Sequence, residues 1–200
     1  MRVKTDEKRL EILQVAAKVF GQNGYHGASM SAISAELGGS KATLYGYYSS
    51  KEELFAAVLM QSLDDQGTAV FRIFEDRDND DLAGQLKKFG RDYLDFITDQ
   101  ETMALFRSAV SEDFEGKLSQ LLYKNGQGRG WGEVEDFMAL KMQQGAISGP
   151  SAQIVSLHLK GLLESGVAEP IMYRCPPLLD FDLAVDAAVD AFMNAYGGAG

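Results

Sequence analysis

The chain has 200 residues, of which 46% are hydrophobic and 24% are charged, and this composition excludes a disordered tail or a fibre. Its apolar runs are far shorter than the roughly 20 residues that span a bilayer. Residues 1–7 lack the apolar stretch of a secretory signal, so we expect a cytoplasmic protein with no membrane partner. The single cysteine, Cys175, excludes an internal disulfide and a multi-cysteine metal site, and we expect neither a metal nor a cofactor.

The charge is divided unevenly along the chain. The whole chain carries a net charge of −10. Residues 1–51 nevertheless hold seven lysines and arginines against four acids, whereas the remainder is strongly acidic. This asymmetry favours a small segment that faces a polyanion, carried on an acidic body that DNA would repel.

Apolar spacing predicts helices almost throughout, and no stretch alternates with the period of a strand. The first predicted helix begins at Asp6 and is ended by Gly21 and then Gly24. Its expected buried positions are Leu10, Leu13, Ala17 and Phe20. Serine caps precede the next three helices: Ser29 for 30–37, Ser40 for a helix to about Tyr47, and Ser49 or Ser50 for a fourth.

The remaining two thirds are also predicted to be helical, with three interruptions. The acidic run 75–81 is interpreted as a solvated loop, and the glycine-rich region 114–132 as loosely structured. Helices are expected over 80–99, 101–113, a segment ending near 144, 151–165 and 180–196. Asp182, Asp186 and Asp190 lie on one side of the last helix, where we expect a solvated face.

Residues 29–48 have the layout of a helix-turn-helix. Two short helices flank the tight turn Gly38-Gly39, and the helix from Asp6 braces them. The second short helix opens with Ser40, Lys41, Ala42 and Thr43, which are small or hydrogen-bonding side chains. Such side chains suit the end of a recognition helix that meets base edges.

The same segment resembles the DNA-binding domain of TetR-family bacterial transcriptional regulators. The resemblance covers about residues 8–60. Its positions are Arg9, Ile12, Leu13, Ala16, Ala17, Val19, Phe20, Gly24 and Tyr25, then Ser29, Met30, Ile33, Ser34 and 38–48, then 51–54. Gly39 and Gly46 depart from the usual family pattern, and both leave the operator preference undetermined. The segments 106–112, 122–123 and 138–145 also resemble the AefR-like subgroup of C-terminal domains.

This resemblance implies which residues contact DNA. Ala42 would meet a thymine methyl group and Lys41 a guanine or a phosphate. The set of implied contacts is Ser29, Ser31, Ser40, Lys41, Ala42, Thr43, Tyr45, Tyr47 and Lys51. Tyr45 as a packing residue and Lys51 as a solvated helix-start residue are the alternatives, and Tyr48 is expected to pack into the core.

The resemblance further implies an all-α fold with two domains. A three-helix helix-turn-helix DNA-binding domain is expected over 6–50, and a helical bundle that binds a ligand and dimerises over 51–200. The helix 151–165 is apolar on nearly every side, which favours burial against both its own domain and a partner. The predicted homodimer interface comprises Ile154, Leu157, His158, Leu162, Val185, Val189 and Phe192. For His158 a satisfied core histidine is the alternative.

Aromatic, methionine and isolated polar side chains of the middle helices are candidates for an effector pocket. They are Phe71, Phe89, Tyr93, Phe96, Met103, Phe106, Arg107, Tyr123, Trp131, Phe137 and Met138. Plain core packing is the alternative for each of them. Arg107 would either anchor a ligand carboxylate or pair with Asp95 or Glu112.

We therefore predict a ligand-responsive DNA-binding regulator. It would be a repressor that binds a palindromic double-stranded operator as a homodimer and is released by a partly apolar small molecule. The alternative is a sensor or partner-binding module, derived from such a regulator, without strong DNA binding. An enzyme is not expected, because the only histidines are His26 and His158 and no metal, phosphate-loop or nucleophile motif is present.

Overall fold

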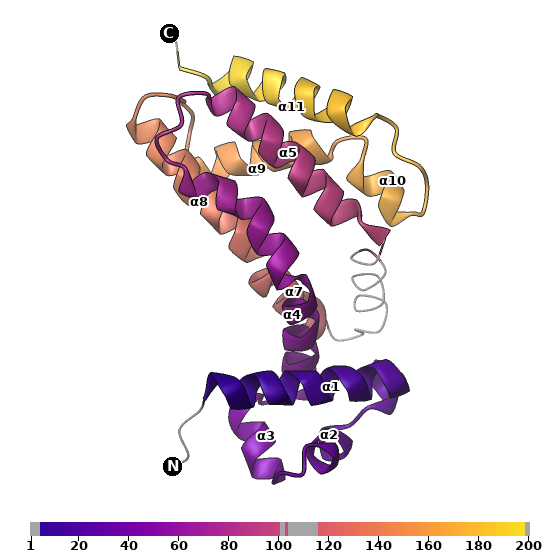
Figure 1. The fold of residues 1–200 in the computed structure, drawn as a ribbon. Coiled ribbons are helices and arrows are strands. Elements are labelled where there is room, and N and C mark those ends of the chain that lie inside the picture. Colours follow the sequence, from indigo (N-terminus) through magenta and orange to yellow (C-terminus); the bar gives the residue numbers. More distant parts are fainter. Residues whose placement is uncertain (1–4, 101–102, 104–115, 199–200) are drawn as a thin grey trace. The chain divides into compact units, whose positions relative to one another are not determined.

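A computed structural model describes residues 5–100, Met103 and residues 116–198, with only the backbone described for residues 62–66. Contacts divide the chain into two compact units. The first unit comprises residues 1–64 and 108–126, and the second comprises residues 65–107 and 127–200. Figure 1 shows that the described elements are helices, which confirms the predicted all-α fold. No described helix is long and apolar enough to cross a membrane.

The first unit contains four helices and the beginning of α4, which continues into the second unit. Its elements are α1 (Asp6–Gly27), α2 (Met30–Glu36), α3 (Lys41–Tyr47), the first part of α4 (Lys51–Phe71), and α7 (Lys117–Asn125). Ile12, Ile33, Leu44 and Leu54, one from each of the first four helices, are fully buried in one cluster. This shared core fixes α2 and α3 on the brace that α1 provides.

Two expectations for α1 are wrong in part. The helix passes through Gly21 without interruption, and the backbone leaves the helical region only at Gly24, where φ is +69°. Leu10 and Ala17 lie on its exposed side, whereas Ile12 and Ala16 are buried. Leu13 and Phe20 are buried as predicted, so the prediction is half correct. The position of α2 and α3 decides which side of a weakly amphipathic helix is covered.

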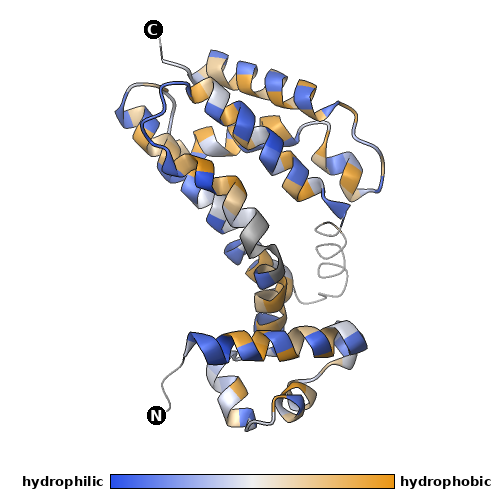
Figure 2. Cartoon of the chain, in the orientation of Figure 1, coloured by the Kyte–Doolittle hydropathy of each residue, from blue (hydrophilic) through white to orange (hydrophobic). Residues whose placement is uncertain are grey.

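The second unit packs helices around a large apolar cluster. Its elements are the end of α4, the short 3₁₀ helix η1 (Arg72–Glu75), α5 (Leu82–Thr98), α8 (Gln127–Gln143), α9 (Ala152–Glu164), α10 (Ala168–Met172) and α11 (Phe181–Tyr196). In Figure 2 hydrophilic residues form stripes on several of these helices, beside hydrophobic stripes. Gly90 on α5 lies against Leu163 and Val185, which shows how closely α5, α9 and α11 approach one another.

The predicted loose region 114–132 is also wrong where it is described, because α7 and the beginning of α8 are helical there. Close packing accounts for one of the glycines in this region, Gly130. A Cβ atom added at Gly130 would lie 2.5 Å from the ring of Phe71, so the end of α4 packs directly on the α8 backbone. This glycine marks a close approach of two helices rather than a loop. The predicted helix over 101–113 lies outside the described residues apart from Met103.

Polar side chains organise two further parts of this unit. Lys141 is buried and donates to the carbonyl oxygens of Arg77 (2.9 Å) and Asn79 (3.2 Å), so the loop predicted at 75–81 is held from within. The predicted solvated acids of α11 are paired with α5. Lys87 lies 3.0 Å from Asp190, and Arg91 lies 2.5 Å from Asp182. These acids therefore form ion pairs with two basic residues of α5. The residue spacing within α11 could not predict this pairing, because it depends on the neighbouring helix.

Candidate nucleic-acid interface and aromatic core

The helix-turn-helix is assembled by local hydrogen bonds. The hydroxyl groups of Ser29 and Ser40 accept from the backbone amides of Ala32 and Thr43, both at 3.1 Å, and so begin α2 and α3 as predicted. In the turn between them, the Ser34 hydroxyl donates to the carbonyl of Gly39 at 3.1 Å, and Gly38 adopts φ +66°. The turn is therefore fixed by a side chain of the helix that precedes it.

One side of α3 is exposed and the other is buried. Leu44 is fully buried, whereas Lys41, Ala42, Tyr45 and Gly46 are exposed, with half of the Tyr45 surface accessible. Ser29, Ser31 and Ser40 are exposed at the starts of α2 and α3, and Thr43 is half-buried. This face presents an ammonium group, hydroxyl groups and a methyl group, which are groups that read base edges and hold phosphates.

Lys51, inferred as a contact to the DNA backbone, has partners within the protein. Its ammonium group donates to the backbone carbonyls of Tyr25 (2.9 Å) and Ala28 (3.3 Å) and lies 4.1 Å from the centroid of the Tyr25 ring. Its neighbour Glu52 accepts from the Tyr25 hydroxyl at 3.0 Å. Lys51 therefore joins the first turn of α4 to the end of α1 beyond its kink, and its ammonium group is already used within the protein.

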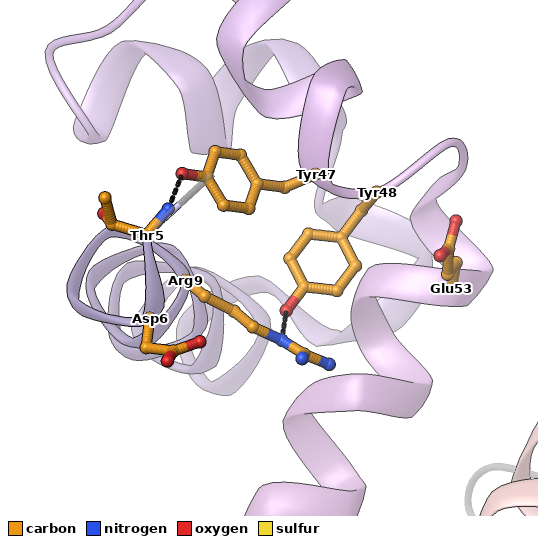
Figure 3. Close-up of a pocket in the computed structure, with 6 residues that line it drawn as sticks. All are labelled: Thr5, Asp6, Arg9, Tyr47, Tyr48 and Glu53. Atoms are coloured by element: carbon orange, nitrogen blue, oxygen red, sulfur yellow. Dashed lines mark hydrogen bonds between the residues drawn. The ribbon is translucent and has the colours of Figure 1, made fainter. Parts of the chain in front are cut away.

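The end of α3 is tied to the beginning of α1. The Tyr47 hydroxyl accepts from the backbone amide of Thr5 at 3.0 Å. Tyr48 is buried, as predicted, and its hydroxyl accepts from Nε of Arg9 at 3.3 Å, which raises the pKa of Arg9. Together with Asp6 and Glu53 these residues line a polar cavity of about 250 Å³, shown in Figure 3. Tyr47 thus lies at the edge of the exposed α3 face. It is half-buried, and its hydroxyl is bonded to the residue before α1.

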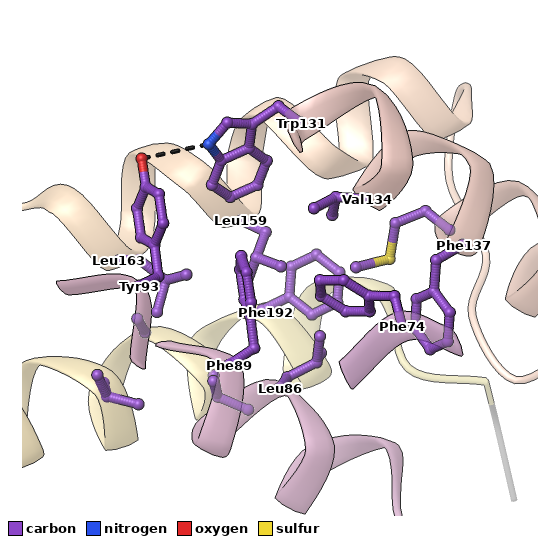
Figure 4. Close-up of a cluster of buried hydrophobic side chains, with 14 of the residues drawn as sticks. Phe74, Leu86, Phe89, Tyr93, Trp131, Val134, Phe137, Leu159, Leu163 and Phe192 are labelled. Carbon is purple, nitrogen blue, oxygen red and sulfur yellow. Dashed lines mark hydrogen bonds between the residues drawn. The ribbon is translucent and has the colours of Figure 1, made fainter. Parts of the chain in front are cut away.

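Several predicted pocket residues meet in the second unit. Figure 4 shows Phe89, Tyr93, Trp131 and Phe137 in one buried cluster, and Met138 belongs to the same core. Phe71 packs 5.5 Å from Phe89, measured between ring centroids. Phe96 is half-buried and packs against the same cluster. Met103 is buried outside this cluster, and Tyr123 is 63% exposed on α7. Phe106 and Arg107 lie outside the described residues.

A polar group stands within this aromatic cluster. The Tyr93 hydroxyl accepts from Nε1 of Trp131 at 3.2 Å and donates to Oε1 of Glu164 at 2.5 Å. Burial and the carboxylate raise the pKa of Tyr93, so its phenol stays neutral. Lys160 lies 3.1 Å from the Glu164 carboxylate. Sequence reasoning missed Lys160 and Glu164, although a charged i, i+4 pair on a largely apolar helix was a signal for them.

The predicted interface residues separate into two groups. Val185, Val189 and Phe192 are fully buried in the core of their own unit, so they do not face a partner. Ile154, Leu157 and His158 are exposed on α9, and Leu162 is half-buried. On the neighbouring α11 the exposed apolar residues include Leu183, Ala187 and Ala191 instead. His158 Nδ1 is hydrogen-bonded to the Tyr196 hydroxyl and thereby links α9 to α11.

An exposed recognition-helix face on a braced helix-turn-helix, followed by a helical unit, defines the class of DNA-binding transcriptional regulators. The profile described as bacterial regulatory proteins of the tetR family matches residues 12–58, and that of the AefR-like transcriptional repressor C-terminal domain matches residues 84–198. The chain therefore belongs to the TetR family of regulators. Both resemblances inferred from the sequence are confirmed.

Individual relatives agree with this assignment. The transcriptional activator FasR of Mycolicibacterium smegmatis is 36% identical over 96 residues, which is 48% of this chain and 43% of FasR. The regulator UidR of Escherichia coli K12 is 39% identical over 75 residues, covering 38% of this chain and 37% of UidR. Each match thus spans less than half of the relative. A TetR-family regulator from Mesorhizobium loti, 24% identical, shares the fold with a TM-score of 0.75 over 97% of this chain and all of its own.

Proposed function

We propose that this regulator binds a palindromic operator as a homodimer, represses the adjoining promoter, and is released by a small-molecule effector. The observation that carries the proposal is the exposed face of α3. Lys41, Ala42 and Tyr45 are open to solvent there, whereas Leu44 on the opposite side is fully buried in the core. Two such faces on one dimer would enter successive major grooves about one helical turn apart.

The exposed sides of α9 and α11 support the homodimer. Ile154 and Leu157 on α9 and Leu183 on α11 are large apolar side chains that are open to solvent, and Leu157 is 52% exposed. Small exposed residues lie beside them, namely Gly161, Ala187 and Ala191, and these allow a second pair of helices to approach closely. Two helices from each subunit would form a four-helix interface.

Analytical ultracentrifugation tests the interface. A single charge placed on the apolar face, as in Leu157→Glu or Ala191→Glu, is expected to convert the dimer into monomers, because the carboxylate would be buried without a partner. Gln144→Glu adds the same charge at an exposed position outside α9 and α11 and should leave the dimer intact. A dimer that withstands both face variants would place the interface elsewhere.

The DNA-binding test begins with selection from a pool of randomised sites, followed by fluorescence anisotropy on the selected site at two salt concentrations. We expect a site with two inverted half-sites and an affinity that falls with salt, since phosphate contacts release counterions. A reporter that carries this site across its promoter should be repressed. Failure to select any site would reject the proposal.

The second candidate is a sensor or partner-binding module without strong DNA binding, and two observations favour it. The Lys51 ammonium group is hydrogen-bonded within the protein, and Gly46 leaves the exposed α3 face without a side chain near its C-terminal end. Each lowers the number of contacts that DNA could receive. A retained ligand response together with binding to random and selected DNA at equal affinity would support this candidate.

We propose that the effector binds in the aromatic core of the second unit. We further propose that the protein acts as a regulator and not as an enzyme. An effector would only need to favour a dimer whose recognition helices are wrongly spaced. A coupling free energy of about 3 kcal/mol lowers operator affinity about 150-fold. Release of the protein from labelled operator by a saturating effector is the direct measurement.

A further inference from the structure

The aromatic core of the second unit contains a buried hydroxyl group that is hydrogen-bonded on two sides. Tyr93, from α5, is almost fully buried, and its hydroxyl is held between the indole N–H of Trp131 on α8 and the carboxylate of Glu164 at the end of α9. Figure 4 shows the tyrosine and tryptophan tips turned toward each other. Polar groups are costly in an apolar core unless they are paired, so a molecule that separates these partners must replace their bonds.

Glu164 connects this hydroxyl group to the surface. About a quarter of its side chain remains accessible, and the same holds for Lys160, whose ammonium group lies 3.1 Å from the carboxylate. Tyr93 is thus a buried hydroxyl with a partly solvated carboxylate as its acceptor. A ligand group that reaches Glu164 from the surface would therefore find the carboxylate as an acceptor and the adjacent Tyr93 hydroxyl as a donor.

The hydrogen-bond requirement favours a neutral group that can both donate and accept. A hydroxyl inserted between Tyr93 and Glu164 donates to the carboxylate and accepts from the phenol, which leaves no group unpaired. A ligand carboxylate would face the Glu164 charge at short range. An acyl chain would leave both partners without a bond.

The surrounding rings select the shape of the ligand. Phe71, Phe89 and Trp131 all pack on Tyr93, with ring centroids 5.2 to 6.3 Å away. Aromatic rings favour such edge and offset contacts with another planar ring. We infer that the effector is a neutral aromatic alcohol, with its hydroxyl bound between Tyr93 and Glu164 and its rings against Phe89 and Trp131. This inference rests on the proposed effector control.

Phe71 is the ring that such a ligand would displace. It is the last residue of α4, and it packs on Phe89, Tyr93 and Trp131, the same rings that the ligand would contact. It is also held against the backbone of Gly130. Displacement of Phe71 would therefore act directly on α4, the helix that begins at Lys51.

Trp131 is the only tryptophan of the chain, so its fluorescence reports this site alone. The full-length protein is titrated with 4-hydroxybiphenyl, biphenyl-4-carboxylate, biphenyl and dodecanoate. We expect 4-hydroxybiphenyl to change the Trp131 emission saturably and to bind at least about tenfold more tightly than the other three probes, the ratio that corresponds to one net hydrogen bond. Tighter binding of the carboxylate or the fatty acid, or no response to any probe, would overturn the inference.

Variants test the two named partners. Tyr93→Phe should abolish the preference for 4-hydroxybiphenyl over biphenyl while leaving biphenyl binding unchanged, and Glu164→Gln should weaken the preference. Asp92→Asn removes the carboxylate of another i, i+4 pair, with Lys88, on the outer side of α5 and is the matched control. If Tyr93→Phe does not fold, the test is made with Glu164→Gln alone, because that side chain is partly exposed. An undiminished preference in Glu164→Gln would overturn the inference.

Operator binding without any probe is measured on the same wild-type protein. Loss of sequence-specific binding there would reject the proposed function. Intact operator binding with no preference for the aromatic alcohol would reject only the assignment of the effector class.

Discussion

The ammonium group of Lys51 lies over the ring of Tyr25, 4.1 Å from its centroid, and donates to the backbone carbonyl of the same residue at 2.9 Å. One side chain thus makes two different contacts with the segment that follows the kink in α1. Glu52 adds a third contact, because it accepts from the Tyr25 hydroxyl. The beginning of α4 is therefore joined to the helix-turn-helix by polar contacts as well as by its apolar core.

We expect Lys51→Gln to lower the free energy of unfolding by about 1–2 kcal/mol, because it removes a hydrogen bond from a charged donor and a cation–π contact. Urea unfolding measures this loss. The slope of operator affinity against salt should not change, since the Lys51 ammonium group is already used within the protein. A slope reduced by about 0.9 with unchanged stability would show that Lys51 turns outward on DNA.

Lys41→Gln should behave in the opposite way. Lys41 is exposed at the first turn of α3, so we expect no change in unfolding free energy. If it contacts a phosphate, the salt slope falls by about 0.9 and affinity weakens on all sequences equally. If it contacts guanine, the loss is confined to sites that carry that base and amounts to about 1–3 kcal/mol. Anisotropy titrations on the selected site and on single-base variants distinguish the two results.

Gly130→Ala is expected to destabilise the second unit by about 1–3 kcal/mol, because the new methyl group would lie 2.5 Å from the Phe71 ring and force it to move. Thermal unfolding and Trp131 emission report the change. Gly132→Ala is the matched control on the same helix. Apart from the chain neighbours and the backbone of the same helix, no atom of the described residues lies within 4 Å of a Cβ at that position. Alanine there should stabilise the helix by about 0.5–1 kcal/mol. Equal effects of the two substitutions would show that Phe71 does not pack on α8.

Stability should depend on the ionisation of Glu52. A hydrogen bond from its own backbone amide, at the start of α4, holds the pKa of this carboxyl below its ordinary value of 4.5. A lowered pKa in the folded state means that the contribution is present above about pH 4.5 and is lost as the pH falls through the folded-state pKa. Glu52→Gln should flatten this acidic part of the profile of unfolding free energy against pH. The exposed Glu133→Gln on α8 should leave that profile unchanged.

Local sequence was sufficient for the helix-turn-helix. Ser29 and Ser40 begin their helices as predicted, and the Gly38-Gly39 turn lies where it was expected, because caps and left-handed glycines depend on the residues within one turn of them. The motif spacing also indicated the family, and the domain profiles confirm it. The predicted boundary between domains at residues 50 and 51 stays a prediction.

Tertiary structure decided the direction in which several side chains point. The pattern of α11 showed an apolar stripe, but only its packing on α5 and α9 shows that Val185, Val189 and Phe192 are internal and that Ala187 and Ala191 are exposed. Lys51 is hydrogen-bonded within the protein because the carbonyls of Tyr25 and Ala28 lie within its reach. The sequence by itself therefore determined the helices and the family, since both depend on local spacing. Burial and pairing depend on residues far apart in the chain, and only the tertiary structure brought Tyr93, Trp131 and Glu164 together.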